Sequence, residues 1–271
     1  MNDVIVLAYH AVSGSWPADL AVSPEHLHDQ LELLVRRGYR GTTFHDAVTV
    51  PSRGKTLAVT FDDAYNSVLE FANPILSSLG LPGTIFVVTD FADDERPLCW
   101  PGIDHWLAGP HDSELRGLSW SQLARLGDAG WEIGSHTRSH PRLTQLDDDA
   151  LRGELRESRA ACERALRQPC RSLAYPYGDV NRRVARAAGD AGYAVAGTLP
   201  ARLDGATRLT WPRLGIYRRD SLRRFRLKVS PSLRRLREIA GPAEDLVRSG
   251  AVRSAGSASA YAFLFLGSNG G

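Results

Sequence analysis

The strongest constraint on the fold is a regular alternation of short β-prone runs with longer stretches of helical periodicity. The expected strands are Val4–Ala8, Thr56–Phe61, Thr84–Val88, Trp131–Gly134, Ser172–Ala174, Tyr193–Gly197 and the strand-like region Leu209–Tyr217. The expected helices lie at residues 24–37, 66–79, 119–129, 146–166, 180–188 and 221–229. Because strands that alternate with helices pair in parallel, the pattern predicts an α/β fold with a parallel sheet, either open or closed into a barrel.

Size and composition are those of an ordinary globular protein. The chain has 271 residues, of which 43% are hydrophobic, so it can bury a sizeable core. Its 33 basic and 31 acidic residues give a net charge of +2, which favours neither nucleic acid nor an anionic membrane as a partner. We expect one domain over residues 1–240 and a loose tail rich in Ser, Gly and Ala over residues 241–271.

Two features bear on location. The apolar run after Asp3 is only five residues long and lacks a basic leader, so it does not resemble a signal peptide, and no run approaches the roughly 18 residues of a membrane span. The three cysteines, Cys99, Cys162 and Cys170, are odd in number and lack metal-type spacing, which indicates free thiols in a reducing compartment. The expectation is a cytoplasmic protein with no membrane span.

Three of the expected strands end in polar or turn-forming stretches. The first runs into two adjacent acids, Asp62 and Asp63, in "LAVTFDDAYNS". The second ends in "GSHTRSH", which contains His136 and His140, and the third in "AYPYG", residues 174–178. Chemistry in parallel α/β folds gathers at the carboxyl ends of the strands, so neighbouring strands would bring these stretches into one pocket.

The paired acids make chemical sense beside the two histidines. Four residues apart on one helical turn, the rings of His136 and His140 would face the same way. With one carboxylate they would form a three-ligand site for a divalent metal, while the other carboxylate takes a proton from water. Each motif alone is weak, because an Asp pair is often a helix cap and H-x-x-x-H is common. Here each motif follows a β-run, and the two motifs together are much stronger evidence for a metal site than either one alone.

These residues carry a family resemblance. "TFDDAYNS" resembles the T-F-D-D-G stretch of the polysaccharide deacetylases of carbohydrate esterase family four. "HTRSH" fits the H-[ST]-x-x-H motif of that family, and "RSLAYPYG" is similar to its R-x-F-R-P-P-Y-G motif. The resemblance covers roughly residues 4–230. It implies a distorted (β/α) barrel of about seven parallel strands, with residues 1–240 as a deacetylase-like catalytic domain.

The resemblance also implies roles for individual residues. Asp62 matches the general base, Asp63 matches a metal ligand, and His136 and His140 match the two histidine ligands. Tyr177 matches the residue whose backbone N–H helps to hold the oxyanion, in a turn shaped by Pro176 and Gly178. The implied cofactor is a divalent metal, usually Zn²⁺, with Co²⁺, Ni²⁺ or Fe²⁺ as alternatives.

The chain departs from the family pattern in the residues around the base. Ala64 replaces the glycine of T-F-D-D-G, which is a small change. Ala174 stands where the fuller motif has an arginine that holds the base carboxylate, so another group must orient Asp62, either Arg213 or Arg171.

A general acid is also missing from its usual place. No histidine follows His140, where many relatives carry the acid in an L-x-H motif. His10 in "LAYHAV" fits a branch of the family that has this histidine near the N-terminus, although a histidine there could also simply cap a strand. An acid is needed because the leaving amine must receive a proton.

The predicted function is metal-dependent hydrolysis of an N-acetyl group from an amino sugar in a polysaccharide, an oligosaccharide or a glycosylated precursor. The alternatives are a cyclic amide or ureide hydrolase on the same scaffold, and an inactive relative that binds glycan. Trp100 and Trp106 belong to an insertion at residues 90–117 and would form either a substrate wall or part of the core. The sequence leaves the sugar, the metal and the oligomeric state open.

Overall fold

The computed structural model describes residues 3–51, 54–93, 96–199 and 206–240. The tail predicted for residues 241–271 lies outside this range. Six parallel strands follow one another around the sheet in the order β1, β5, β6, β7, β8 and β9. They are β1 (Asp3–Tyr9), β5 (Lys55–Phe61), β6 (Gly83–Val87), β7 (Glu132–Ser135), β8 (Ser172–Ala174) and β9 (Val195–Thr198).

A short segment, residues 211–215, pairs with both edge strands and so closes this sheet into a barrel. β10 (Trp211–Pro212) pairs with β9, and β11 (Leu214–Gly215) pairs with β1. Only Arg213 separates β10 from β11, so residues 211–215 occupy the seventh position and join the two edges of the sheet. β4 (Arg40–Thr42) adds a branch on β5, and β2 (Ala11–Val12) pairs with β3 (Ala21–Val22). This arrangement confirms the predicted distorted barrel.

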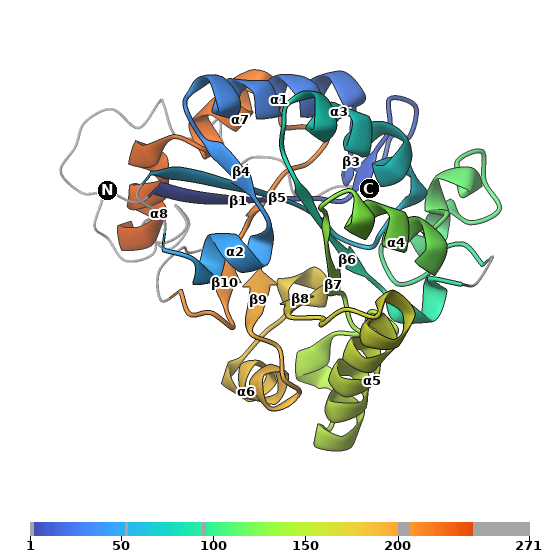
Figure 1. Ribbon diagram of the computed structural model, residues 1–271. Helices are drawn as coiled ribbons and strands as arrows, with labels where there is room; N and C mark the ends of the chain where they lie inside the picture. Colours follow the sequence, from blue (N-terminus) through green and yellow to red (C-terminus); the bar gives the residue numbers. More distant parts are fainter. Residues whose placement is uncertain (1–2, 52–53, 94–95, 200–205, 241–271) are drawn as a thin grey trace, which may run out of the picture.

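Helices surround the barrel (Figure 1). α1, α3 and α7 lie along the top of the view, and α5 and α6 lie at the bottom. The α-helices are α1 (Pro24–Arg36), α2 (Phe44–Thr49), α3 (Asn73–Ser78), α4 (Trp120–Asp128), α5 (Asp148–Leu166), α6 (Arg182–Asp190), α7 (Leu222–Lys228) and α8 (Pro231–Ala240). A π-helical turn, Val68–Ala72, precedes α3 in the region predicted as one helix. None of the helices in the described ranges combines the length and the apolar character needed to cross a bilayer.

Side-chain caps fix where several helices begin. Ser23, Ser119, Asp147 and Asn181 each accept a hydrogen bond from a backbone N–H in the first turn of the helix that follows. Such caps satisfy donors that have no partner within the helix, which is why these residue types mark helix starts. Ser119 is the cap of α4, and its partner Gln122 completes a capping box.

Two apolar clusters hold the barrel together. The larger lies mainly between the strands and the surrounding helices, as expected for parallel strands that are buried on both faces. The smaller combines Val6, Ala58, Phe86, Ala174 and Val195, one from each of five strands, with Phe44 and Ala47 of α2. α2 lies across the middle of the barrel in Figure 1. The Asp pair, the two histidines and the turn at residues 176–178 all follow the carboxyl ends of strands β5, β7 and β8.

Candidate active site

Asp63, His136 and His140 converge beyond the ends of β5 and β7. Asp63 Oδ1 lies 3.4 Å from His136 Nε2 and 3.4 Å from His140 Nε2. One potential ligand atom from each residue falls within 4.8 Å of the others. All three side chains are almost fully buried, with 3%, 1% and 5% of their residue surface exposed. The strand ends therefore bring together the three residues that the sequence suggested as metal ligands.

The donor atoms fit a divalent metal ion. Zinc binds imidazole nitrogen and carboxylate oxygen at about 2.0–2.1 Å, so neighbouring ligands of a tetrahedral ion lie about 3.4 Å apart. Asp63 Oδ1 is buried and has no hydrogen-bond partner among the described residues. His136 Nδ1 lies 2.8 Å from the carbonyl oxygen of Ala174, and a proton donated there leaves the Nε2 lone pair free to bind a metal. Two nitrogens and one oxygen suit Zn²⁺, Co²⁺, Ni²⁺ or Fe²⁺.

The two histidines do not lie on a helical turn, and the prediction that they do was wrong. β7 ends at Ser135, and residues 136–140 form an irregular loop. Thr137 has a φ of 69° and His140 a φ of 65°, which is the left-handed region that a β-branched residue rarely adopts. The two rings lie near each other, with centres 4.9 Å apart, on this irregular loop and not on one face of a helix. The side chain of Thr137 contributes, because its hydroxyl accepts a hydrogen bond from His140 N–H at 3.1 Å.

Burial sets the electrostatics of the triad. Burial, and after it the negative charge of Asp62, raise the pKa of Asp63 well above its usual range. Burial lowers the pKa of His136 to about 4 and that of His140 well below its usual range. Without a cation, the triad therefore favours a neutral carboxyl and neutral imidazoles. A divalent cation would offset the penalty of burying the Asp63 carboxylate, and protons would compete with it for that oxygen.

Asp62 is held apart from the triad by Arg213. The guanidinium donates two hydrogen bonds to the carboxylate, from Nη1 to Oδ1 at 2.6 Å and from Nη2 to Oδ2 at 2.8 Å. It also donates to Thr60 Oγ1 at 3.0 Å. Both Asp62 and Arg213 are 1% exposed. Burial alone would raise the pKa of Asp62, but the charge and hydrogen bonds of Arg213 outweigh it, so the carboxyl stays ionised well below its usual pKa.

Arg213 reaches Asp62 through the inside of the barrel. It sits between β10 and β11, where the barrel closes, with its guanidinium 5.3 Å from the centre of the Phe86 ring. Gly197 of β9 leaves room for it, since a Cβ there would lie 2.6 Å from Arg213 Nε. Ala174 also projects into this interior cluster. Arg171, the alternative candidate for orienting Asp62, is exposed.

His10 lies next to Asp62 because β1 and β5 are neighbours in register. Tyr9 is opposite Phe61, and the Asp62 N–H donates to the Tyr9 carbonyl at 2.9 Å. Burial lowers the pKa of His10, the charge of Asp62 opposes this, and Arg213 adds to it. His10 Nδ1 is buried without a hydrogen-bond partner in the described structure. A strand-capping role through Nδ1 would need a hydrogen bond that this nitrogen does not make with any described residue.

The turn after β8 forms another side of the site. Tyr177 and Gly178 both have positive φ, 58° and 69°, and a Cβ at Gly178 would lie 2.9 Å from Leu199. Pro176 begins this short 3₁₀ turn. The Tyr177 ring packs edge-on against His140, with ring centres 4.7 Å apart, so the turn is fixed against one of the two histidines.

Comparison with known proteins identifies the family. The family model described as polysaccharide deacetylase matches residues 49–196, which is more than half of the chain. The chain belongs to the polysaccharide deacetylase family. The curated "Putative polysaccharide deacetylase YxkH" of Bacillus subtilis is 24% identical over 193 residues, which are 69% of this chain and 61% of YxkH. The chain thus spans less than two thirds of the length of that relative.

Solved structures share the deacetylase fold. The Streptococcus pyogenes deacetylase PplD, solved in complex with acetate, superposes with a TM-score of 0.69 at 23% identity, covering 84% of this chain and 98% of PplD. BC0361, a polysaccharide deacetylase from Bacillus cereus, gives a TM-score of 0.64 at 24% identity and covers 84% of this chain and 69% of its own. At these identities the likeness establishes the fold and not the activity.

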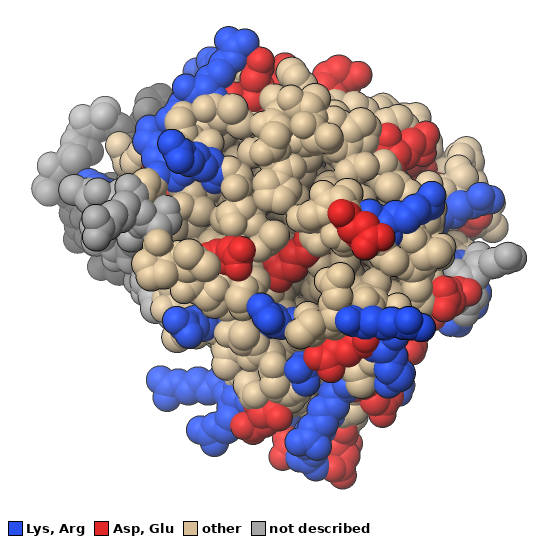
Figure 2. Space-filling view, viewed as in Figure 1, with Lys and Arg blue, Asp and Glu red and all other residues tan. Residues whose placement is uncertain are grey.

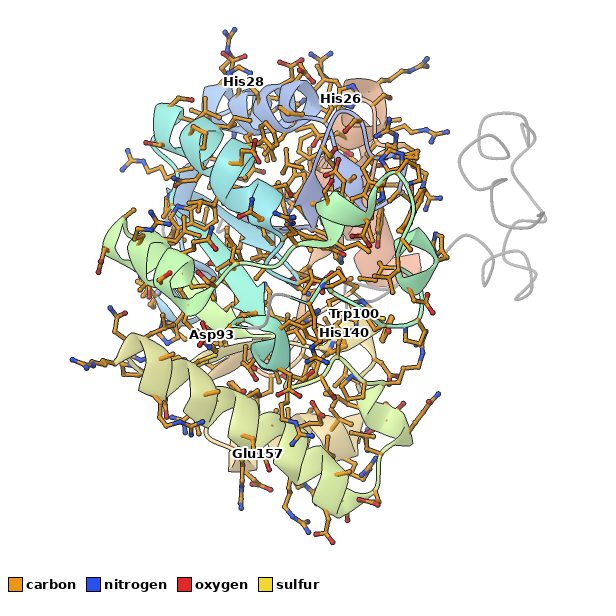
Figure 3. The ribbon with its side chains drawn as sticks, turned by 90° about the vertical axis from the view of Figure 1, so that its right-hand side faces the viewer. His26, His28, Asp93, Trp100, His140 and Glu157 are labelled. Atoms are coloured by element: carbon orange, nitrogen blue, oxygen red, sulfur yellow. The ribbon has the colours of Figure 1, made fainter. Side chains whose placement is uncertain are left out.

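In this deacetylase-family chain, the insertion after β6 packs against the group formed by Asp63, His136 and His140. Trp100 stacks on the His140 ring, with ring centres 4.2 Å apart and planes 23° apart, and Figure 3 shows the two side by side. Trp100 is only 6% exposed and also meets Phe91 edge-on. Trp106 packs against Trp16, and the Tyr177 hydroxyl donates to the Pro101 carbonyl at 3.1 Å. Trp100 is therefore a packed wall beside His140, not an open platform for a sugar ring.

Proposed function

We propose that this chain is a metal-dependent hydrolase that removes the N-acetyl group from an amino sugar in a polysaccharide, an oligosaccharide or a glycosylated precursor. The observation that carries this proposal is the separation of the two adjacent acids. Asp63 points to the histidines, while Asp62 is paired with Arg213 and left beside His10. A metal ligand and a separate ionised base are what amide hydrolysis at a single ion requires, and family membership gives the acetylated sugar as the substrate class.

We propose Zn²⁺ as the ion held by Asp63, His136 and His140, with Co²⁺, Ni²⁺ or Fe²⁺ as functional substitutes. When bound, such an ion would polarise the acetyl carbonyl and lower the pKa of a water molecule beside it. The support is the fit of the three donor atoms to a tetrahedral ion and the tautomer of His136 that its bond to Ala174 selects.

The protein residues carry the protons. Asp62 takes one proton from water as the water oxygen bonds to the acetyl carbon. His10 gives a proton to the amide nitrogen as the carbon–nitrogen bond breaks, so the products are acetate and a free amine. The lowered pKa of His10 makes its protonated ring a stronger acid toward the leaving nitrogen. The Tyr177 backbone N–H, in the turn formed with Pro176 and Gly178, would stabilise the oxyanion.

The first test of function is acetate release from a panel of N-acetylated sugars, using protein stripped of metal and reloaded with Zn²⁺, Co²⁺ or Ni²⁺. We expect acetate only from the reloaded protein. Ring opening of a cyclic amide, without acetate from any sugar, would instead support the cyclic amide hydrolase. Sugar binding by a metal-loaded protein that never releases acetate would support the inactive glycan-binding relative.

A second test addresses His10. The His10→Gln variant should bind the metal with unchanged affinity and lose about 10²–10⁴-fold in kcat, because general acid catalysis contributes that much. The partly exposed His26 on α1 provides the matched control, and His26→Gln should leave kcat unchanged. A fully active His10→Gln variant would remove His10 from the proposed mechanism.

A further inference from the structure

The loop that carries both metal-ligand histidines is anchored through its backbone N–H groups by side-chain acceptors. Thr137 N–H donates to Ser135 Oγ at 3.1 Å, and His140 N–H donates to Thr137 Oγ1 at 3.1 Å. The two N–H groups between them, those of Arg138 and Ser139, both donate to one oxygen of Glu154, at 2.9 and 3.0 Å. Four consecutive donors are thus satisfied without any regular secondary structure.

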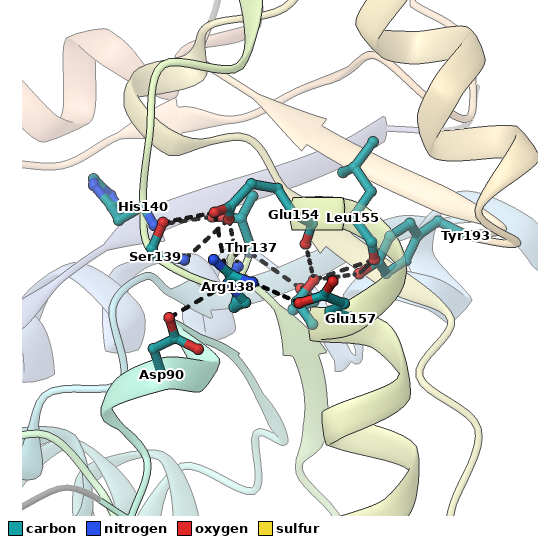
Figure 4. A network of polar contacts seen from close by, with 11 residues as sticks. Asp90, Thr137, Arg138, Ser139, His140, Glu154, Leu155, Glu157 and Tyr193 are labelled. Carbon is teal, nitrogen blue, oxygen red and sulfur yellow. Dashed lines mark hydrogen bonds and ion pairs between the residues drawn. The ribbon is translucent and has the colours of Figure 1, made fainter. Parts of the chain in front are cut away.

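Glu154 lies on α5 in an unusual setting for a carboxylate. It shares the buried stripe of this helix with Leu151, Leu155, Ser158 and Cys162 and is only 7% exposed. Glutamate is rarely buried unless its charge is partnered. Its second oxygen accepts from the Ser139 hydroxyl at 2.6 Å, so three donors from two consecutive loop residues converge on one carboxylate (Figure 4). Every one of them belongs to the segment between His136 and His140.

The loop needs such an anchor because its backbone is strained. Thr137 and His140 both hold a positive φ, and such residues persist only where their surroundings impose the conformation. Thr137 O and Arg138 O accept from Thr89 N–H and Asp90 N–H at 3.2 and 3.0 Å, which fixes the other side of the loop. Glu154 supplies the only charged acceptor for this backbone among the described residues. Hydrogen bonds to a charged group are about twice as strong as neutral ones.

We infer that Glu154 is a positioning residue of the metal centre, which holds His136 and His140 in the geometry that receives the ion. This inference rests on the proposed metal site. Glu157 lies about one turn after Glu154 on α5, and its side chain is exposed to solvent. It interacts with the Arg138 side chain at 2.6 Å and, within the described residues, makes no hydrogen bond to the loop backbone. Glu157 therefore provides a control on the same helix, with the same charge and a contact to the same loop residue.

The expected result follows from which atoms each variant keeps. Glu154→Ala removes all three acceptor contacts and should weaken the affinity for Co²⁺ by about 10–100-fold, the loss typical of residues that orient metal ligands. Glu154→Gln keeps one carbonyl oxygen for the two N–H groups, so it should recover most of that affinity. Activity lost by Glu154→Ala at limiting metal should return at saturating metal, because Asp62 and His10 are untouched. Glu157→Ala should bind Co²⁺ as the parent protein does.

The measurement is Co²⁺ affinity by competition with a chelator, together with the Co²⁺ absorption spectrum and the thermal unfolding of each metal-free variant. A weaker affinity and altered spectrum for Glu154→Ala, with Glu157→Ala unchanged, would support the inference. Parent-like Co²⁺ affinity in Glu154→Ala would overturn it, as would equal losses in both alanine variants. If Glu154→Ala does not fold, two milder variants replace it. Ser139→Ala and Glu154→Gln each remove part of the contact, and each must then show a small but measurable loss of Co²⁺ affinity. Failure of the parent protein itself to bind Co²⁺ would refute the proposed metal site instead.

Discussion

Replacement of Asp62 by asparagine should leave the metal site able to bind its ion while kcat falls by about 10²–10⁴-fold, the usual contribution of a general base. The reason is the division of the two acids, since Asp62 contacts Arg213 and Asp63 faces the histidines. Asparagine keeps an oxygen for one Arg213 hydrogen bond but cannot take a proton from water. Metal content by elemental analysis and kcat at saturating metal test this expectation.

The adjacent Asp63 supplies the matched comparison. Asp63→Asn should lose metal affinity and activity together, because a neutral amide replaces the one anionic ligand of the triad. Both variants must first be shown to be folded by circular dichroism, since each changes a buried acid. If Asp62→Asn released the metal and Asp63→Asn retained it, the two roles would be reversed.

The general location of this site could be predicted from the sequence because parallel strands share one carboxyl edge. The β-runs before Asp62 and before His136 were long enough to identify, so their polar ends had to lie on the same side of the sheet. The order in which the strands pair in the sheet could not be predicted in the same way. β1 lies beside β5 although β4 comes between them in the chain, and only this pairing places His10 beside Asp62.

The conformation of the histidine loop was not predictable from the four-residue spacing. A helical turn and an irregular loop can both bring two rings together, and the choice depends on contacts from distant residues. Glu154, on a helix that contains two other glutamates, gives no local signal of its contact with Arg138 and Ser139. Trp100 was likewise ambiguous, because an aromatic residue in an insertion can face the solvent or pack on a ligand ring.

The group that orients Asp62 could be narrowed to two arginines from the sequence but not further. Arg213 reaches the carboxylate because the barrel closes at residues 211–215 and because Gly197 leaves space inside. Both conditions belong to the closed barrel. Arg171, which lies just before β8, remains exposed. The role of Arg213 is therefore a proposal that mutation can test directly.

Arg213→Met should lower both stability and turnover. Removing one partner of a buried ion pair leaves the other charge without compensation, which destabilises proteins by about 3–5 kcal/mol. Without the two hydrogen bonds that fix its carboxylate, Asp62 should also lose its alignment, and a misplacement of about 1 Å can reduce turnover by about 10²-fold. Chemical denaturation gives the free energy of unfolding, and steady-state kinetics at saturating metal gives kcat.

The pH dependence of stability and of kcat/KM should also change in Arg213→Met, and its direction follows from the pKa of Asp62. In the parent protein Arg213 holds the pKa of Asp62 well below its usual range, so the stabilisation from this pair is present above the unfolded carboxyl pKa of about 3.9 and disappears as the pH falls through the folded pKa. In Arg213→Met burial acts with less opposition and raises that pKa. Asp62 should then become protonated at a higher pH, which moves the acidic limb of kcat/KM upward.

Three further variants separate orientation from charge. Arg213→Lys keeps a positive charge but cannot donate two parallel hydrogen bonds, so it should preserve more of the stability than of the turnover. Gly197→Ala should displace Arg213 without removing it, because the added Cβ would lie 2.6 Å from Nε, and should reproduce part of the loss in kcat. Arg171→Met should match the parent protein in stability and in pH profile. An unchanged pH profile of kcat/KM in Arg213→Met would mean that Arg213 does not set the pKa of Asp62.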